Sequence, residues 1–271
     1  MRYAVLADIH GNLEALRAAL AEARRRGAPE LLVLGDLVGY GPEPNGCVEL
    51  VAELDATCVR GNHDLIALGR LSDERCIPLA RESLRWTREV LRPEASRFLE
   101  RLPLRARAQD GVVLAHGSLD DPETYTASPQ DAAAQLARLA EVDPTARFLL
   151  LGHTHRPLAL STLRGWSATS GAISLAGGDR AVLNPGSVGQ SREWRARVRL
   201  LILDTEHDTA EFVAVPYDDE RSRAALRRSG LSERGVHLRP SPPRYLARAA
   251  RARVQARRLR RRDIPASLAG P

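Results

Sequence analysis

The chain has 271 residues, 44% of them hydrophobic, and a formal net charge of +6, so it is long enough for one large domain or two small ones with a substantial core. The first residues, MRYAVLADIH, turn polar too soon for a signal peptide or a membrane helix, so we expect a cytoplasmic protein without a membrane partner. Three cysteines without CxxC spacing favour free thiols over disulfides or a zinc site.

Most of the positive charge lies in the C-terminal tail. Residues 239–271 contain ten arginines and a single acid, which leaves residues 1–238 with a formal net charge of −3. We therefore expect one domain over residues 1–238 and an Arg/Pro-rich tail over residues 239–271. Nucleic-acid binding by the tail is one interpretation, but all forty basic residues of the chain are arginine, and a compositionally biased, disordered terminus is the preferred one.

The first third of the chain alternates strand and helix patterns. Residues 2–8 form an apolar run, and residues 13–26 repeat leucine and alanine at helical spacing. A second strand over 30–36, a helix over 45–54 and a third strand over 56–62 follow. This βαβαβ order predicts a parallel sheet covered by helices.

The next segment, residues 65–108, has a different pattern. It contains two Arg- and Glu-rich amphipathic stretches, 78–91 and 93–102, without strand character. We predict a helical cap insertion that covers the substrate crevice.

The remainder returns to strands. Residues 111–118 resume the sheet, 128–141 have the cap, proline and acid of a helix start, and 146–155 form another strand. After residue 157 we expect no helix but a second, largely antiparallel sheet with strands at 158–163, 173–178, 180–188, 198–204 and 209–216. The predicted fold is a four-layer α/β/β/α sandwich of two mixed sheets.

Five of the seven histidines lie in polar clusters that follow apolar runs. These clusters are VLADIH (His10), CVRGNHD (His63), VVLAH (His116) and LLLGHTH (His153 and His155), and the run ELLVLGD ends in Asp36. Because the carboxyl ends of parallel strands border the ligand crevice of such sheets, we expect the clusters to form one site.

The residue types in these clusters are those of a metal site. The candidates are Asp8, His10, Asp36, Asn62, His63, His116, His153 and His155. Carboxylate, imidazole and amide ligands without a thiolate suit Mn, Fe, Zn, Ni or Co better than Ca. Even seven of these residues as oxygen and nitrogen ligands are too many for one ordinary site and enough for two.

The motifs DIH, GDLVGYG, GNHD, AHG and GHTH, in this order from Asp8 to His155, resemble the five motifs of the calcineurin-like metallophosphoesterases, whose fold is the same four-layer sandwich. In addition, LNPGSVGQSR at 183–192 resembles a feature of the bacterial phosphodiesterase-like branch. Five ordered motifs make a specific signal, whereas any one alone would be weak.

The resemblance implies roles for these residues. One metal would be held by Asp8, His10 and His155, the second by Asn62, His116 and His153, with Asp36 bridging. Two divalent ions, with Mn favoured, would share a hydroxide that attacks a phosphodiester or nucleotide-type ester in line. His63 would be the general acid, and Asp64 would orient it and keep it cationic.

One departure from the family bears on the substrate. Phosphoprotein phosphatases carry an Asp-Arg pair where this chain has Gly39 and Tyr40. We therefore favour a phosphodiesterase or nucleotide hydrolase over a phosphomonoesterase, including a protein phosphatase, and over a metal-binding scaffold without turnover. Arg60, Tyr125 and Arg192 are candidates for substrate contact, although surface or packing roles are preferred. The expected partner is a small phosphate ester or nucleotide, and the oligomeric state is left open.

Overall fold

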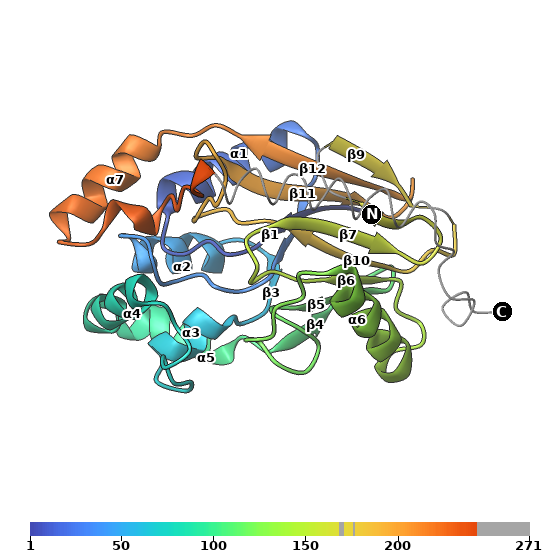
Figure 1. Cartoon of the computed structure of the whole chain (residues 1–271), viewed down its shortest axis with the longest axis horizontal. Coiled ribbons are helices and arrows are strands. Elements are labelled where there is room, and N and C mark those ends of the chain that lie inside the picture. The colour runs from blue at the N-terminus through green and yellow to red at the C-terminus, as the bar shows by residue number, and fades with distance from the viewer. Residues whose placement is uncertain (168–170, 176, 243–271) are drawn as a thin grey trace.

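The computed structural model describes residues 1–167, 171–175 and 177–242. Two six-stranded sheets lie face to face, with α1 (Leu13–Arg25) and α6 (Pro129–Val142) on opposite outer faces (Figure 1). The order in the first sheet is β3 (Ala56–Cys58), β2 (Glu30–Val33), β1 (Arg2–Leu6), β11 (Val198–Asp204), β12 (Thr209–Val215) and β9 (Gly171–Ser174). The order in the second sheet is β4 (Arg105–Arg107), β5 (Val112–Ala115), β6 (Phe148–Leu150), β10 (Ala181–Pro185), β7 (Pro157–Ser161) and β8 (Gly165–Ser167). The predicted sandwich of two mixed sheets is confirmed.

The distribution of strands between the sheets differs from the prediction. Strands β5 and β6 do not rejoin the first sheet but form the parallel centre of the second, together with β10. Conversely, β11 and β12 extend the first sheet through antiparallel pairing of β11 with β1. The second sheet is therefore mixed and not largely antiparallel.

Alternate side chains of the central strands enter different layers of the core. In β1, Val5 packs between the sheets and Leu6 packs on the α1 side. In β6, Leu150 faces the other sheet and Leu149 faces the α6 side. Both faces of these strands are buried, which explains their continuous apolar runs.

The predicted helical insertion belongs to the outer layer of the first sheet. The other helices are α2 (Pro44–Ala52), α3 (Asn62–Ala67), α4 (Pro78–Val90), α5 (Pro93–Arg101), α7 (Asp219–Arg228) and the short 3₁₀ helix η1 (Glu233–Gly235). Leu84 of α4 and Leu99 of α5 are fully buried in the same core as α1 and α2. The end of the predicted insertion is wrong, because β4 lies inside residues 65–108 and pairs with β5.

Helix α7 contradicts the expectation that helices end at residue 157. Its sequence, DERSRAALRR, is mostly charged, and its two fully buried residues are Ser222 and Leu226, so it has no broad apolar stripe to reveal it. Ser222 Oγ donates to Asn12 Oδ1 at 2.8 Å, which ties α7 to the start of α1.

None of the helices in the described ranges has the length and apolarity needed to cross a membrane. Residue 176, within the predicted strand 173–178, and most of the predicted tail, from residue 243 onward, lie outside the described residues.

Candidate active site

The predicted site residues all follow strands at one edge of the two sheets. Asp8 and His10 follow β1, Asp36 follows β2, Asn62, His63 and Asp64 begin α3 after β3, His116 follows β5, and His153 and His155 follow β6. Five of them have a positive φ between 49° and 65°: Asp8, His10, Asp36, His153 and His155. Non-glycine residues adopt this conformation at an energetic cost and cluster in it at functional sites.

Two histidines face each other through nitrogen lone pairs. His10 Nδ1 lies 3.1 Å from the Val38 carbonyl oxygen, and His155 Nδ1 lies 3.1 Å from that of Gln190. A carbonyl oxygen only accepts, so each Nδ1 carries the ring proton, and both Nε2 atoms, 3.0 Å apart, present lone pairs. A cation bound by both nitrogens relieves this repulsion, and a backbone carbonyl on the other nitrogen is the usual support for a metal-binding histidine.

A second group of acceptors converges on the other side of Asp36. His116 Nδ1 lies 2.6 Å from the Leu34 carbonyl oxygen, so its Nε2 faces Asn62 Oδ1 at 3.1 Å and Asp36 Oδ2 at 3.2 Å. His153 Nε2 lies 3.1 Å from the Glu123 carbonyl oxygen, which leaves its Nδ1 for this group. Asp36 Oδ2 is also 3.7 Å from His10 Nε2, so this carboxylate lies between the two groups.

Asp8 adds an unsatisfied carboxylate oxygen. Its Oδ1 accepts the His153 amide at 2.9 Å, but its buried Oδ2 has no hydrogen-bond partner among the described residues. Burial raises the pKa of Asp8 to about 7. The residues present therefore fit divalent metal binding, because the atoms that converge are acceptors.

The protonation states of the histidines agree with metal binding. Burial lowers the pKa of His10 and of His155 well below the usual range, and burial, reinforced by His116, lowers that of His153 to about 3. These rings are neutral, as metal ligation requires. Burial opposes ionisation of His116, but the adjacent Asp36 carboxylate outweighs it and raises its pKa to about 9. The acceptors around His116 thus favour a positive charge at this point.

The His63 ring is held by its neighbours Gly39 and Tyr40. Gly39 has φ +84°, and a Cβ on it would collide with His63 Nδ1. The Tyr40 ring lies 4.8 Å from the His63 ring, centroid to centroid, and the His10 ring lies 4.7 Å away, nearly edge-on. Gly39 and Tyr40 occupy the positions where phosphoprotein phosphatases have the Asp-Arg pair. In this chain they pack against the His63 ring and fix its position.

Asp64 has a different role from the one that the resemblance implied. Its Oδ2 accepts the Gly61 amide at 2.9 Å, which caps α3, and its Oδ1 accepts the Val38 amide at 3.2 Å. His63 Nδ1 has no hydrogen-bond partner in the described part of the chain, and burial lowers its pKa. The expected contact by which Asp64 orients His63 and keeps it cationic is not formed, because the position of Asp64 in the first turn of α3 directs its carboxylate to backbone amides.

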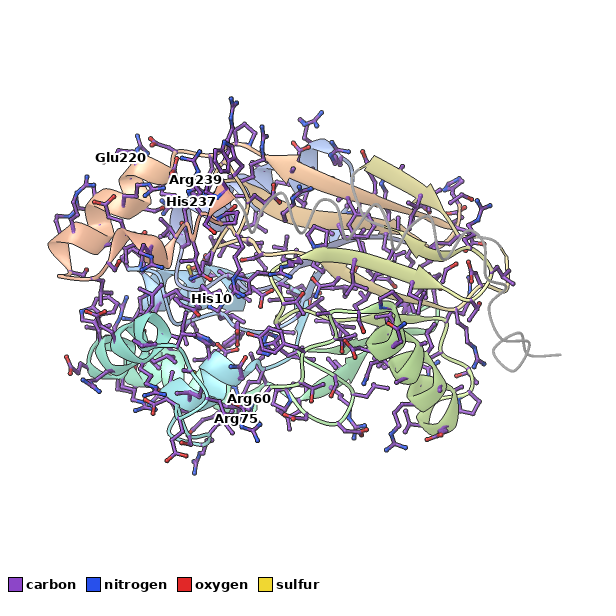
Figure 2. The ribbon with its side chains drawn as sticks, in the orientation of Figure 1. His10, Arg60, Arg75, Glu220, His237 and Arg239 are labelled. Carbon is purple, nitrogen blue, oxygen red and sulfur yellow. The ribbon has the colours of Figure 1, made fainter. Side chains whose placement is uncertain are left out.

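A pocket of about 420 Å³ opens over these groups. Its lining includes Asp36, Tyr40, Asn62, His63, Arg75, Cys76, Ile77, Ala80, Glu123, Tyr125, His153, His155, Arg192 and Leu238. Of the three candidates for substrate contact, Tyr125 and Arg192 line the pocket. Arg60 is not among its described lining residues, because its guanidinium lies against the Glu100 carbonyl at 3.3 Å; Figure 2 shows it beside α3.

The loop after β10, residues 186–192, supports the site in a way that the sequence did not reveal. Ser187 Oγ and the Gly189 amide both donate to the Asp8 carbonyl oxygen at 2.9 Å. A Cβ at Gly189 would collide with the Ile9 carbonyl oxygen, so only glycine fits there. The motif LNPGSVGQSR was the available signal, but nothing in it indicates that the loop lies against β1.

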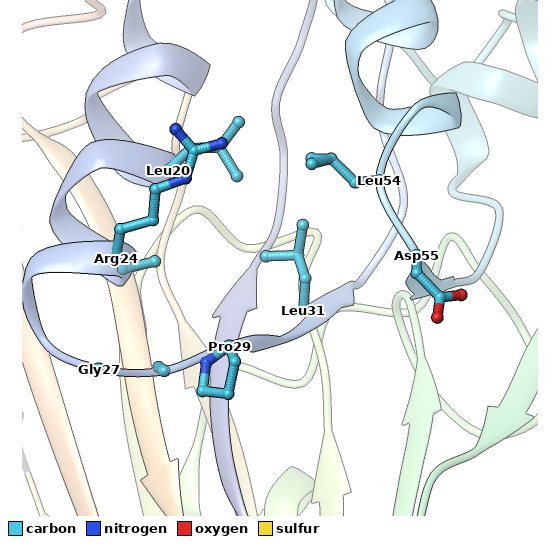
Figure 3. A pocket seen from close by; sticks show the side chains of 9 residues that line it. Leu20, Arg24, Gly27, Pro29, Leu31, Leu54 and Asp55 are labelled. Carbon is cyan, nitrogen blue, oxygen red and sulfur yellow. The ribbon is translucent and has the colours of Figure 1, made fainter.

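A second cavity, of about 510 Å³, lies at the opposite ends of β1 and β2, beneath the end of α1 (Figure 3). Leu20, Ala23, Leu31 and Leu54 give it apolar walls, with Arg24 and Asp55 among its lining residues. Its described lining holds no histidine and only one carboxylate, so it offers no comparable chemistry.

Comparisons with known proteins identify a family for this chain. The family model of the calcineurin-like phosphoesterases matches residues 1–157. An uncharacterized protein of Methanocaldococcus jannaschii is 32% identical over 233 residues, which cover 85% of this chain and 93% of that protein. Serine/threonine-protein phosphatase 1 of Salmonella typhimurium is 45% identical over 65 residues, which cover 24% of this chain and 30% of that protein.

Solved structures show the same architecture. A metallophosphoesterase from Sphaerobacter thermophilus superposes with a TM-score of 0.74 at 33% identity, over 87% of this chain and 97% of that one. A hypothetical protein from Pyrococcus horikoshii, at 22% identity, shares the fold with a TM-score of 0.69 over 87% of this chain and 96% of that one. Since the family model covers more than half of the chain and every predicted metal ligand, the chain belongs to the calcineurin-like phosphoesterase family.

Proposed function

We propose that this protein is a dinuclear metal-dependent hydrolase that prefers phosphodiesters or nucleotide-type phosphate esters. The observation that carries the proposal is the convergence of acceptor atoms on both sides of Asp36 at the floor of the pocket. Family membership supports phosphoric ester hydrolysis. Mn is the favoured metal, with Fe, Zn, Ni or Co as alternatives, because the donors mix imidazole, carboxylate and amide oxygen without a thiolate. We place the activity in the cytoplasm, where the three free cysteines would stay reduced.

The proposed ligands divide into two groups about Asp36. Asp8, His10 and His155 would hold one cation, and Asn62, His116 and His153 the other. Such ions, when bound, activate water and neutralise phosphoryl oxygens. Asp36 keeps its own position by accepting the His63 amide at 2.8 Å, so the bridging carboxylate and the start of α3 are fixed together.

His63 and the pocket rim would act on the leaving group. The His63 ring lies at the pocket wall beside His10, where its protonated form can pass a proton to the departing oxygen. Burial opposes this form, and the Asp36 carboxylate favours it. Ile77 and Tyr125, whose exposed fractions are 46% and 55%, offer an apolar surface in the same pocket. This surface suits the base of a nucleoside or an apolar alcohol.

Protein phosphatase activity is the second candidate, favoured by the 65-residue similarity to the Salmonella phosphatase. Against it stands Gly39, where the Cβ of an aspartate would collide with the His63 ring at a backbone φ of +84°. A metal-binding scaffold without turnover is the remaining alternative, although the chain retains every predicted ligand.

A hydrolysis panel tests the proposal. Metal-stripped protein is supplied with Mn²⁺ and offered bis-p-nitrophenyl phosphate, p-nitrophenyl phosphate, a phosphoserine peptide, cyclic nucleotides and dinucleoside polyphosphates. We expect turnover that requires the metal and is fastest with diesters or nucleotides. A preference for the monoester or the peptide would favour the second candidate. No turnover by protein with confirmed bound metal would favour the scaffold.

A further inference from the structure

Arg192 is a cation of the pocket for which the described residues supply no counter-ion. It ends the 186–192 loop, is half-buried and lines the pocket together with His155. Its Nε donates to Gln190 Oε1 at 3.2 Å, and its Nη2 lies 3.5 Å from His155 Nε2. Within the described ranges it forms no ion pair with a carboxylate.

The other arginine of the pocket differs on this point. Arg75 is largely exposed, at 75% of its side chain, and forms an ion pair with Glu123 at 3.2 Å. Arg75 is therefore already neutralised, whereas the charge of Arg192 is available to a ligand.

The backbone that carries Arg192 is fixed on both sides of the site. The Val188 amide donates to the Ala7 carbonyl oxygen at 2.9 Å, and His155 Nδ1 donates to the Gln190 carbonyl oxygen at 3.1 Å. On the far side, the Ser191 amide donates to the Val236 carbonyl oxygen at 3.1 Å. A residue held in this way meets a ligand with little cost in conformational entropy.

The charges of the site favour an anion in front of Arg192. Two divalent cations would be balanced only in part by the carboxylates of Asp8 and Asp36, and Arg192 adds a further positive charge at the same wall. The planar guanidinium can donate two parallel hydrogen bonds to two oxygens of a phosphoryl group. An incoming phosphate ester supplies both the negative charge and the oxygens.

We propose that Arg192 binds the non-bridging oxygens of the phosphoryl group and orients it toward the metal pair. This proposal rests on the proposed function and adds its phosphate-holding residue. It also accounts for the absence of an arginine at position 40, because the positive charge comes from a loop of the other sheet, after β10. The substrate is accordingly an ester whose reacting phosphate carries at least one free anionic oxygen.

Calorimetric binding of inorganic phosphate to Mn²⁺-treated protein is the test. We expect Arg192→Ala to raise the dissociation constant about 10- to 100-fold, the range for losing charged hydrogen bonds, and Arg192→Lys to give an intermediate value. Arg75→Ala is the matched control, since it removes the same charge from the same pocket, and we expect a change of less than about 3-fold. The Mn content of all variants should equal that of the wild type.

Three outcomes would overturn the proposal: phosphate affinity in Arg192→Ala within twofold of the wild type, loss of Mn from that variant, or no phosphate binding by the wild type. Ester hydrolysis is measured in parallel. If phosphate binding depends on Arg192 but no ester is hydrolysed, the proposed function fails and the phosphate site stands.

Discussion

At the scale of single residues, the sequence GNHD at positions 61–64 combines three different tasks. Asn62 Oδ1 faces His116 Nε2 and is proposed as a ligand of the second metal, His63 lies at the pocket wall, and Asp64 caps the helix that carries both. The His63 ring lies near His10 and Asp36, with which it could also hold a metal ion, but in the proposed assignment the metals are held without it and it is left to move the proton. Its removal should therefore separate catalysis from metal binding.

We predict that His63→Ala keeps two metals per chain but loses about 10²- to 10⁴-fold in turnover of alkyl or nucleoside esters, the range for a positioned proton donor. The loss should be much smaller for nitrophenyl esters, because p-nitrophenolate departs without a proton. Steady-state kinetics on both ester types and elemental analysis provide the measurement. Equal losses on both esters, or a missing metal, would show that His63 is a ligand or an electrostatic contact.

Gly39 allows an independent test of the same position. Gly39→Ala places a Cβ against His63 Nδ1 and strains a residue with φ +84°, at a cost of about 1–2 kcal/mol in folding free energy. We expect this variant to fold, to keep its metals and to show the leaving-group dependence of His63→Ala. Gly27→Ala, also at positive φ but with open space around it, is the control for backbone strain. If both glycine variants keep full turnover of alkyl esters, the position of the His63 ring does not depend on Gly39.

Cys76 reports on access to the pocket. It is half-buried and lines the pocket, whereas Cys47 and Cys58 are buried elsewhere. Burial, with a contribution from Asp36, raises the pKa of Cys76 to about 11. Alkylation requires the thiolate, so its rate at Cys76 should rise about tenfold per unit between pH 7 and pH 10. Mass spectrometry of iodoacetamide-treated protein should find Cys76 labelled first; initial labelling of Cys47 or Cys58 would contradict this description of the pocket.

Residue types and their order were enough to predict which side chains gather at the site, because ligand chemistry is local to each motif. The role of Asp64 was not predictable, since an acid after a histidine looks the same whether it bonds to the ring or caps the helix. The sequence favoured a surface or packing role for Arg192 over substrate contact, for another reason. In a chain whose basic residues are all arginine, a single arginine carries no signal until its missing counter-ion is seen.

At the scale of elements, the C-terminal segment 236–238 supports the site from the side of α7. Leu238 lines the pocket, and its amide donates to the Ser191 carbonyl oxygen at 2.9 Å. His237 Nε2 donates to the Glu193 carbonyl oxygen at 2.9 Å; Figure 2 shows His237 next to Arg239. These bonds hold the loop that carries Arg192.

Truncation should therefore have a sharp boundary. A chain that ends at residue 242 should keep its turnover of a small diester, because it retains the described contacts of segment 236–238. A chain that ends at residue 235 should lose about tenfold or more, since a displaced substrate-holding group is costly, and its affinity for inorganic phosphate should fall with it. Equal activity of the two truncated chains would show that the segment does not position the loop. A chain ending at 242 that fails to fold would make the remaining tail part of the core.

The division of strands between the sheets was the least predictable feature of the elements. Strands β1, β5 and β6 are apolar on both faces, so their sequences do not say which sheet they join. Pairing of β11 with β1 joins residues about 200 positions apart, for which no local pattern exists. The start of α6 was easier to predict, because the cap Ser128 and its partner Asp131 lie three residues apart in the sequence.

At the scale of the whole molecule, the site exists only where the two sheets meet. Asp8, His10, Asp36 and Asn62 come from the first sheet, and His116, His153 and His155 come from the second. Asp36 Oδ2 lies 3.2 Å from His116 Nε2 and 3.7 Å from His10 Nε2, one histidine from each sheet, and it is the carboxylate that we propose as the bridge between the two metals. It is therefore the residue on which the dinuclear account depends most.

The most direct measurement is the metal content and the diester turnover of Asp36→Asn beside Asn62→Ala, both purified with Mn²⁺. The account predicts that wild-type protein binds two metals per chain, that Asp36→Asn loses more metal than Asn62→Ala, and that turnover of bis-p-nitrophenyl phosphate falls with the metal in both. An Asp36→Asn variant that keeps two metals while Asn62→Ala loses both, or a metal-free wild-type protein with full turnover, would contradict it.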